Sequence, residues 1–147
     1  MDTKNRSKSF EDRLDGRFEG VLRWPDLDAL WMRVIQGKKP WYVYEVGRDV
    51  PTKPLETQAL TEQIKSIDSF LHREHDHDYC GVVYVDDAGD PSLIKVLDPN
   101  NLGASCGSGG VKIWPKYILS LGPPSAVGEK LDAEGKPAWW KTLVFKS

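Results

Sequence analysis

The first clear pattern along the chain is an apolar stripe at helical spacing. It consists of Leu27, Leu30, Trp31, Val34 and Ile35, which recur three and four residues apart. Pro25 suits the first turn of a helix and Gly37 suits its end, so we predict a helix over residues 25–36. A second stripe, formed by Leu60, Ile64, Ile67 and Leu71, follows Pro54 and predicts a second helix that ends near residue 73.

The remaining regular patterns are typical of strands. Residues 41–47 (WYVYEVG) are aromatic or β-branched on both faces, which predicts a central strand covered on each side. Two further strand-like stretches flank the turn-forming residues DAGDP, and they predict a hairpin over residues 80–98. The last segment, KLDAEGKPAWWKTLVFK, predicts a C-terminal hairpin that turns at residues 133–136.

These elements predict an α+β fold in which two helices pack on a mostly antiparallel sheet. Residues 1–17 are polar, mixed in charge and without periodicity, so we interpret them as a mobile polar arm. Residues 18–147 then form a single domain, because their number is that of one ordinary domain. A thioredoxin-like arrangement is a more distant alternative, since the early strand–helix order permits it but the sequence has no Cys-x-x-Cys motif.

The composition of the chain argues against two classes of partner, nucleic acids and membranes. The net charge of −2 argues against a nucleic-acid partner, because such proteins usually present a basic face. No apolar run approaches the roughly 18 residues of a membrane span, and the first residues lack the apolar segment of a secretory signal. With only two cysteines, the expected location is the cytoplasm, where thiols stay reduced.

A cluster of potential metal ligands follows the second predicted helix. His72, His75, His77 and Cys80 lie within nine positions, and imidazole and thiolate groups are ligands that zinc prefers. Their spacing matches no standard zinc signature. The alternative interpretation is a solvated helix end, where histidine interacts favourably with the helix dipole, followed by a small buried cysteine at the start of a strand.

The second cysteine lies in a glycine-rich segment, GASCGSGG, over residues 103–110. Exposed backbone amides there could bind an anion, lower the thiol pKa of Cys106 and make it a nucleophile. The alternative is a connecting loop with an incidental cysteine. Because the predicted hairpin returns the chain to its starting edge, we also expect that one zinc site could combine the ligands His72, His75, His77, Cys80 and Cys106.

Six tryptophans form the last distinctive feature. Trp139 and Trp140 are adjacent, so on a strand they point to opposite faces, and an edge hairpin would leave one of them exposed. The leading prediction is a small cytoplasmic accessory protein, without catalytic chemistry, that binds a protein partner or a second copy through aromatic surface. The alternatives are a metal- or redox-responsive protein that uses the His/Cys cluster, and a thiol enzyme that uses Cys106.

Overall fold

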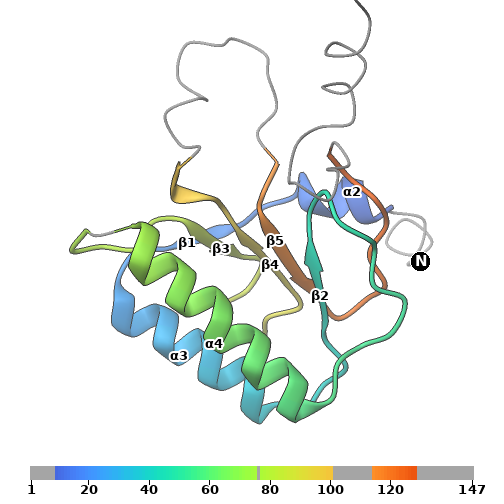
Figure 1. Ribbon diagram of the computed structural model, residues 1–147, viewed down its shortest axis with the longest axis horizontal. Coiled ribbons are helices and arrows are strands. Elements are labelled where there is room, and N and C mark those ends of the chain that lie inside the picture. The colour runs from blue at the N-terminus through green and yellow to red at the C-terminus, as the bar shows by residue number, and fades with distance from the viewer. Residues whose placement is uncertain (1–8, 76, 101–113, 129–147) are drawn as a thin grey trace, which may run out of the picture.

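The computed structural model describes residues 9–75, 77–100 and 114–128 of the chain. The helices in these residues are α2 (Phe10–Leu14), α3 (Trp24–Gln36) and α4 (Thr57–Glu74). The strands are β1 (Glu19–Val21), β2 (Tyr42–Glu45), β3 (Val83–Val85), β4 (Leu93–Val96) and β5 (Tyr117–Ser120). The predicted α+β class is therefore confirmed, and the described residues form one compact domain (Figure 1).

All five strands form one antiparallel sheet with the order β1-β3-β4-β5-β2. The predicted hairpin is the β3–β4 pair, in which Val83 lies opposite Val96. Residues 41–47 do not form the predicted central strand among the described residues, where β2 lies at an edge of the sheet. Both faces of β2 are nevertheless covered, since Val43 and Tyr44 belong to two different apolar clusters.

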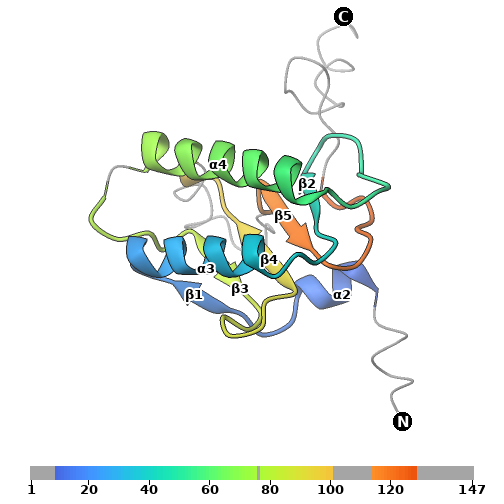
Figure 2. The ribbon, with the colours of Figure 1, turned by 90° about the horizontal axis from the view of Figure 1, so that it is seen from below.

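The larger cluster lies between the sheet and the helices α3 and α4. The two helices lie side by side across one face of the sheet, as Figure 2 shows from below. Every residue of the two predicted stripes except the half-buried Ile35 is buried there. The indole Nε1 of Trp31 on α3 donates a hydrogen bond to Asp68 Oδ1 on α4 at 3.0 Å, which fixes the two helices relative to each other.

The opposite face of the sheet carries the smaller cluster, which α2 helps to cover. Its buried members are Phe10, Leu14, Tyr44, Leu93, Ile118 and Val127. The predicted arm over residues 1–17 is therefore wrong for residues 10–14. A capping box between Ser9 and Asp12 begins α2, which places Phe10 and Leu14 on the side that faces the sheet. Two apolar residues four positions apart were too weak a period to reveal this helix from the sequence.

Two predictions concern residues outside the described ranges. These are the C-terminal hairpin with its adjacent Trp139 and Trp140, and the glycine-rich segment that contains Cys106. Both stay predictions. Within the part of the chain that the structure describes, no helix combines the length and the apolar character that crossing a membrane requires.

Candidate functional site

The three histidines lie in a group of five rings at one end of the molecule. This aromatic cluster consists of Trp24, His72, His75, His77 and Tyr79. Trp24 is the first residue of α3, His72 lies in the last turn of α4, and the other three lie between α4 and β3. The cluster therefore joins segments that are far apart in the sequence.

Ring contacts and one hydrogen bond define its geometry. Trp24 stacks on His72, with ring centroids 4.1 Å apart and planes 26° apart. His75 and His77 meet edge to face at 4.5 Å, and the His77 and Tyr79 rings are nearly parallel at 6.1 Å. The indole Nε1 of Trp24 donates to the backbone oxygen of His77 at 2.9 Å. This bond ties the connection after α4 to the start of α3.

The cluster has a buried base and an exposed outer surface. His75 is only 7% exposed, and its Nε2 is buried without a hydrogen-bond partner among the described residues. The side chains of His72 and Tyr79 are 50% and 58% exposed, and His77 is exposed as well. Three rings of the cluster are therefore available to another molecule, while His75 packs beneath them.

His72 also interacts with α4 itself. Its Nε2 lies 3.5 Å from Asp68 Oδ2, one helical turn earlier, while Oδ1 of the same carboxylate accepts the Trp31 bond. Asp68 therefore lies beside the imidazole at the surface and also accepts the hydrogen bond of an indole in the core. When His72 is protonated, the carboxylate and the imidazolium form an ion pair within α4.

Cys80 is buried, unlike the exposed rings, and has the character of a structural thiol. It is fully buried in the larger apolar cluster, and its backbone N–H donates to Leu22 O at 2.7 Å. Burial raises the pKa of the Cys80 thiol above its ordinary range, so little reactive thiolate is present at neutral pH. These observations agree with the interpretation of Cys80 as a small buried residue.

The structure brings the three histidines together but does not arrange them as metal ligands with Cys80. Among the described residues, no group of three His, Cys, Asp or Glu side chains could hold a metal ion. Cys106, the fifth predicted ligand, lies outside the described residues. The combined zinc site thus stays a prediction, and its described members do not assemble the three or four ligands that zinc usually takes.

Sequence reasoning missed Trp24 and Tyr79 as members of this site. Tyr79 lies between His77 and Cys80, and Trp24 directly precedes the proline that begins α3. A tyrosine amid polar residues, outside any apolar stripe, was the available signal for an exposed ring. No local signal could pair Trp24 with His72, because their contact depends on how α3 and α4 pack.

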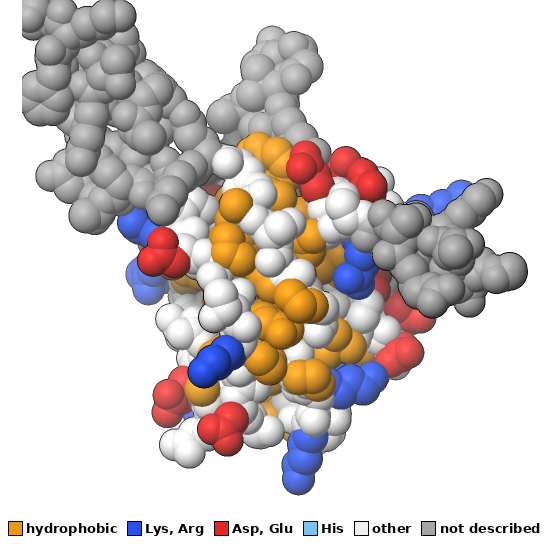
Figure 3. Space-filling model, turned by 90° about the vertical axis from the view of Figure 1, so that its right-hand side faces the viewer, with side chains coloured by type: hydrophobic (Ala, Val, Ile, Leu, Met, Phe, Trp, Pro, Cys, Tyr) orange, Lys and Arg blue, Asp and Glu red, His pale blue; other side chains and the backbone are white. Residues whose placement is uncertain are grey.

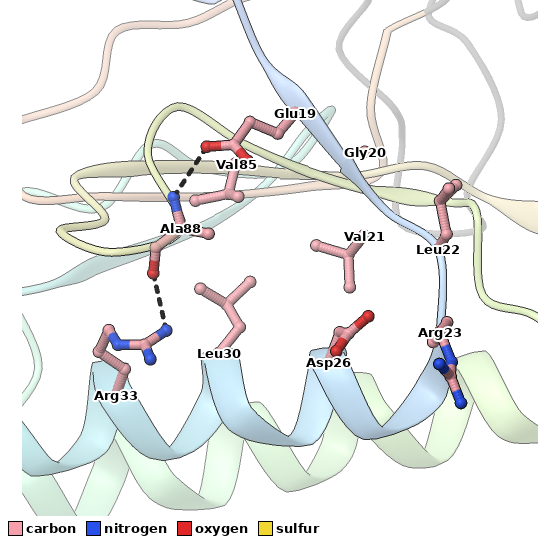
Figure 4. Close-up of a pocket in the computed structure, with 10 residues that line it drawn as sticks. All are labelled: Glu19, Gly20, Val21, Leu22, Arg23, Asp26, Leu30, Arg33, Val85 and Ala88. Carbon is pink, nitrogen blue, oxygen red and sulfur yellow. Dashed lines mark hydrogen bonds between the residues drawn. The ribbon is translucent and has the colours of Figure 1, made fainter.

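A cavity of about 360 Å³ lies between β1 and α3. Figure 4 shows its lining, with the apolar side chains of Val21, Leu30 and Val85 between two charged ends. At one end, Glu19 Oε2 accepts a hydrogen bond from the backbone N–H of Ala88 at 3.2 Å, and Arg33 Nη1 donates to Ala88 O at 2.7 Å. At the other end lie Arg23 and Asp26.

A second apolar surface lies on the side of the molecule that carries β2 and α2. Figure 3 shows apolar side chains in a band down the middle of this side, with charged side chains on its flanks.

Comparisons with known proteins supply no further information on the site. The sequence matches no family model, and searches of curated proteins and of solved structures find no similar protein.

Proposed function

We propose that this chain is a small cytoplasmic protein-binding module without catalytic chemistry of its own, and that it binds a protein partner through the aromatic cluster. The observation that carries the proposal is a pair of ring stacks, Trp24 on His72 and His77 beside Tyr79, in which His72, His77 and Tyr79 are exposed and Trp24 is half-buried. Tryptophan and tyrosine are enriched in protein interfaces because they bury a large area and keep a polar group available.

The rigidity of the cluster supports a binding role. A side chain that is already fixed in the free protein loses less conformational entropy when a partner covers it. Trp24 is held by its stack on His72 and by the bond to His77 O, and Tyr79 packs over Gly81, where an added Cβ would lie 3.1 Å from the ring. Because Gly81 has a φ of +70°, it sets the turn that presents Tyr79 outward.

The cytoplasmic part of the proposal is supported by the state of the described cysteine. Cys80 is a free, buried thiol within the apolar core. Thiols of this kind are usual in a reducing compartment. We also propose that neither a nucleic acid nor a membrane is the partner, which agrees with the net charge of −2 and with a surface built from rings rather than basic groups.

The test compares the full chain with a variant whose surface has lost one ring. Tyr79→Asp removes an exposed ring without removing a core residue, and Met32→Asp is the matched control because Met32 is 51% exposed on the outside of α3. Proteins retained from an extract by the immobilised chain are identified, and the affinity of each purified candidate is measured by calorimetry. We expect Tyr79→Asp to weaken binding at least tenfold, as for an interface hot spot, and Met32→Asp to leave it unchanged.

Two results would contradict the proposal. One is a partner whose affinity for Tyr79→Asp and for a second variant, His72→Asp, equals that for the unmodified chain. The other is a reaction catalysed by the chain that depends on Cys106. Circular dichroism of each variant confirms that a loss of binding does not reflect a loss of fold.

Metal binding by His75 and His77 is a second candidate function. The observation in its favour is the buried Nε2 of His75, which has no described partner and lies in a ring that contacts His77. Elemental analysis of the chain purified without chelator tests it. One zinc per chain, lost in His75→Asn, would favour the metal-binding function, whereas a substoichiometric zinc content would contradict it.

A further inference from the structure

The outer edge of β1 is open in the described structure. β1 pairs with β3 on one side only, and no described strand lies along its other side. An unpaired edge presents backbone N–H and C=O groups that can bind a further strand. Leu22 directly follows β1 and is 61% exposed, while its carbonyl oxygen accepts a hydrogen bond from Cys80 N–H within the chain.

Each end of this edge carries one acidic and one basic side chain. At one end the acidic residue lies on β1 and the basic residue on α3, and at the other end the basic residue precedes α3 and the acidic residue lies on it. Glu19 and Arg33 lie at the end where β1 begins, whereas Arg23 and Asp26 lie at the end where α3 begins (Figure 4). Glu19 and Arg33 each use one atom to hold Ala88, which leaves a second carboxylate oxygen and further guanidinium N–H groups. The four side chains together carry no net charge.

We propose that the β1 edge binds the β1 edge of a second copy of this chain, antiparallel and around a two-fold axis at Val21. In that register Glu19 lies opposite the partner's Arg23, and Arg23 lies opposite the partner's Glu19. The same rotation brings Asp26 toward the partner's Arg33, because these two residues lie at opposite ends of the cavity. Every charge therefore meets an opposite charge, as a self-complementary two-fold interface requires.

The apolar side chains fit the same register. Leu22 comes opposite the partner's Gly20, which has no side chain to obstruct it. A Cβ at Gly20 would lie 3.3 Å from the Tyr84 ring, so the surface that receives Leu22 is the ring of a neighbouring strand. The exposed Leu22 is thus buried against a tyrosine, and the two five-stranded sheets become one continuous sheet.

A second copy fits this edge better than an unrelated extended peptide. A peptide could satisfy the backbone groups equally well, but it would have to carry a basic residue and an acidic residue four positions apart in the correct direction. The chain itself carries this pair as Glu19 and Arg23. The inference goes beyond the proposed binding function, since it concerns β1 rather than the aromatic cluster.

Charge reversal tests the register directly. Sedimentation velocity over a range of concentrations gives the dimer dissociation constant of the full chain. We expect Arg23→Glu and Glu19→Arg to raise it at least tenfold each, because like charges then lie opposite one another. Mixing the two variants in equal amounts makes the facing charges complementary, so the mixture should dimerise with a constant within about threefold of the unmodified chain.

Matched controls separate the register from general effects of charge and polarity. Lys53→Glu makes the same change of charge in the connection between β2 and α4, and it should leave dimerisation unchanged. Leu22→Asp should weaken the dimer, and Met32→Asp, on the outside of α3, should not. Thermal unfolding of each variant shows that the monomer is intact.

Three results would overturn the inference. The first is a full chain that stays monomeric up to about 1 mM, the concentration at which even weak association is detected. The second is a dimer that neither single reversal weakens. The third is a mixture of the two reversed variants that stays monomeric, which would show that Glu19 and Arg23 do not face each other. If Tyr79→Asp loses partner binding but still forms the dimer, then partner binding by the aromatic cluster and dimerisation through β1 are separate properties.

Discussion

The indole of Trp24 and the imidazole of His72 are stacked, with centroids 4.1 Å apart. This contact joins the first residue of α3 to the last turn of α4, and the bond from Trp24 Nε1 to His77 O extends it to the connection that follows. One tryptophan thus fixes the end of a helix pair and the exposed rings beside it. Loss of that side chain should affect both stability and the surface.

We expect Trp24→Ala to lower the free energy of unfolding by about 2 kcal/mol, less than for a fully buried aromatic residue because Trp24 is only half-buried. Trp24→Phe keeps a ring for the His72 stack but loses the donor, and should cost about 1 kcal/mol. Urea denaturation gives both values. Equal losses for the two variants would show that the hydrogen bond, rather than the stack, holds the cluster.

The second prediction concerns the stability contributed by the core between the helices and the sheet. Leu30 and Ile64 are each 2% exposed and lie in the larger apolar cluster. Truncation of either side chain to alanine should cost about 2–5 kcal/mol, because it removes buried methyl groups and leaves a cavity. Denaturation measures the loss, and values below about 0.5 kcal/mol at both positions would mean that α3 and α4 do not pack as described.

The third prediction concerns the stability that α2 contributes by packing on the sheet. Phe10 is 8% exposed against Leu14 and the second face of the sheet. Phe10→Ala should therefore lower the free energy of unfolding by about 3 kcal/mol. Glu11→Ala, in the same helix but exposed, is the control and should change it by less than about 0.5 kcal/mol. An unchanged melting temperature for Phe10→Ala would restore the interpretation of these residues as part of an unpacked arm.

The side chain of Asp86 holds the connection between β3 and β4 through hydrogen bonds. Its Oδ1 accepts backbone hydrogen bonds from Asp87, Ser92 and Leu93 at 2.9, 3.0 and 3.1 Å, and its Oδ2 accepts from the Ser92 hydroxyl. Removal of the carboxylate in Asp86→Ala should cost about 2–3 kcal/mol, since several donors lose a charged acceptor. Asp90→Ala removes only an exposed ion pair with Lys39 and should cost less than about 1 kcal/mol. Similar costs would contradict a special role for Asp86.

Stability should also fall in alkaline solution. Burial is the main cause that raises the pKa of both the Cys80 thiol and the Tyr117 phenol. Groups whose pKa is higher in the folded state favour folding below the unfolded pKa, and that contribution is lost as the pH rises toward the folded pKa. The free energy of unfolding should therefore decrease above about pH 8.5, where a free thiol begins to ionise.

The variants Cys80→Ala and Tyr117→Phe test this dependence, because each removes one ionisation. Between pH 8 and pH 10.5, which span roughly the thiol and phenol pKa values, each variant should lose less stability than the unmodified chain. The comparison uses urea denaturation at each pH. A slope that is identical in all three proteins would show that other groups cause the alkaline loss.

The sequence by itself determined the elements whose signal is local. The stripes from Leu27 to Ile35 and from Leu60 to Leu71 specify α3 and α4, because residues three and four apart share one face of a helix. The β3–β4 hairpin was equally predictable, since its strands flank a turn of Asp, Gly and Pro residues. The α+β class follows from these elements alone.

Only the tertiary structure decided how these elements meet. It placed β2 at an edge of the described sheet, although its residues are apolar on both faces, because covered faces do not reveal a strand's neighbours. It brought Trp24 to His72, and it buried Phe10 and Leu14 beneath the sheet. Local periodicity encodes which side of a segment is apolar, but the partner of that side depends on contacts between residues distant in the chain.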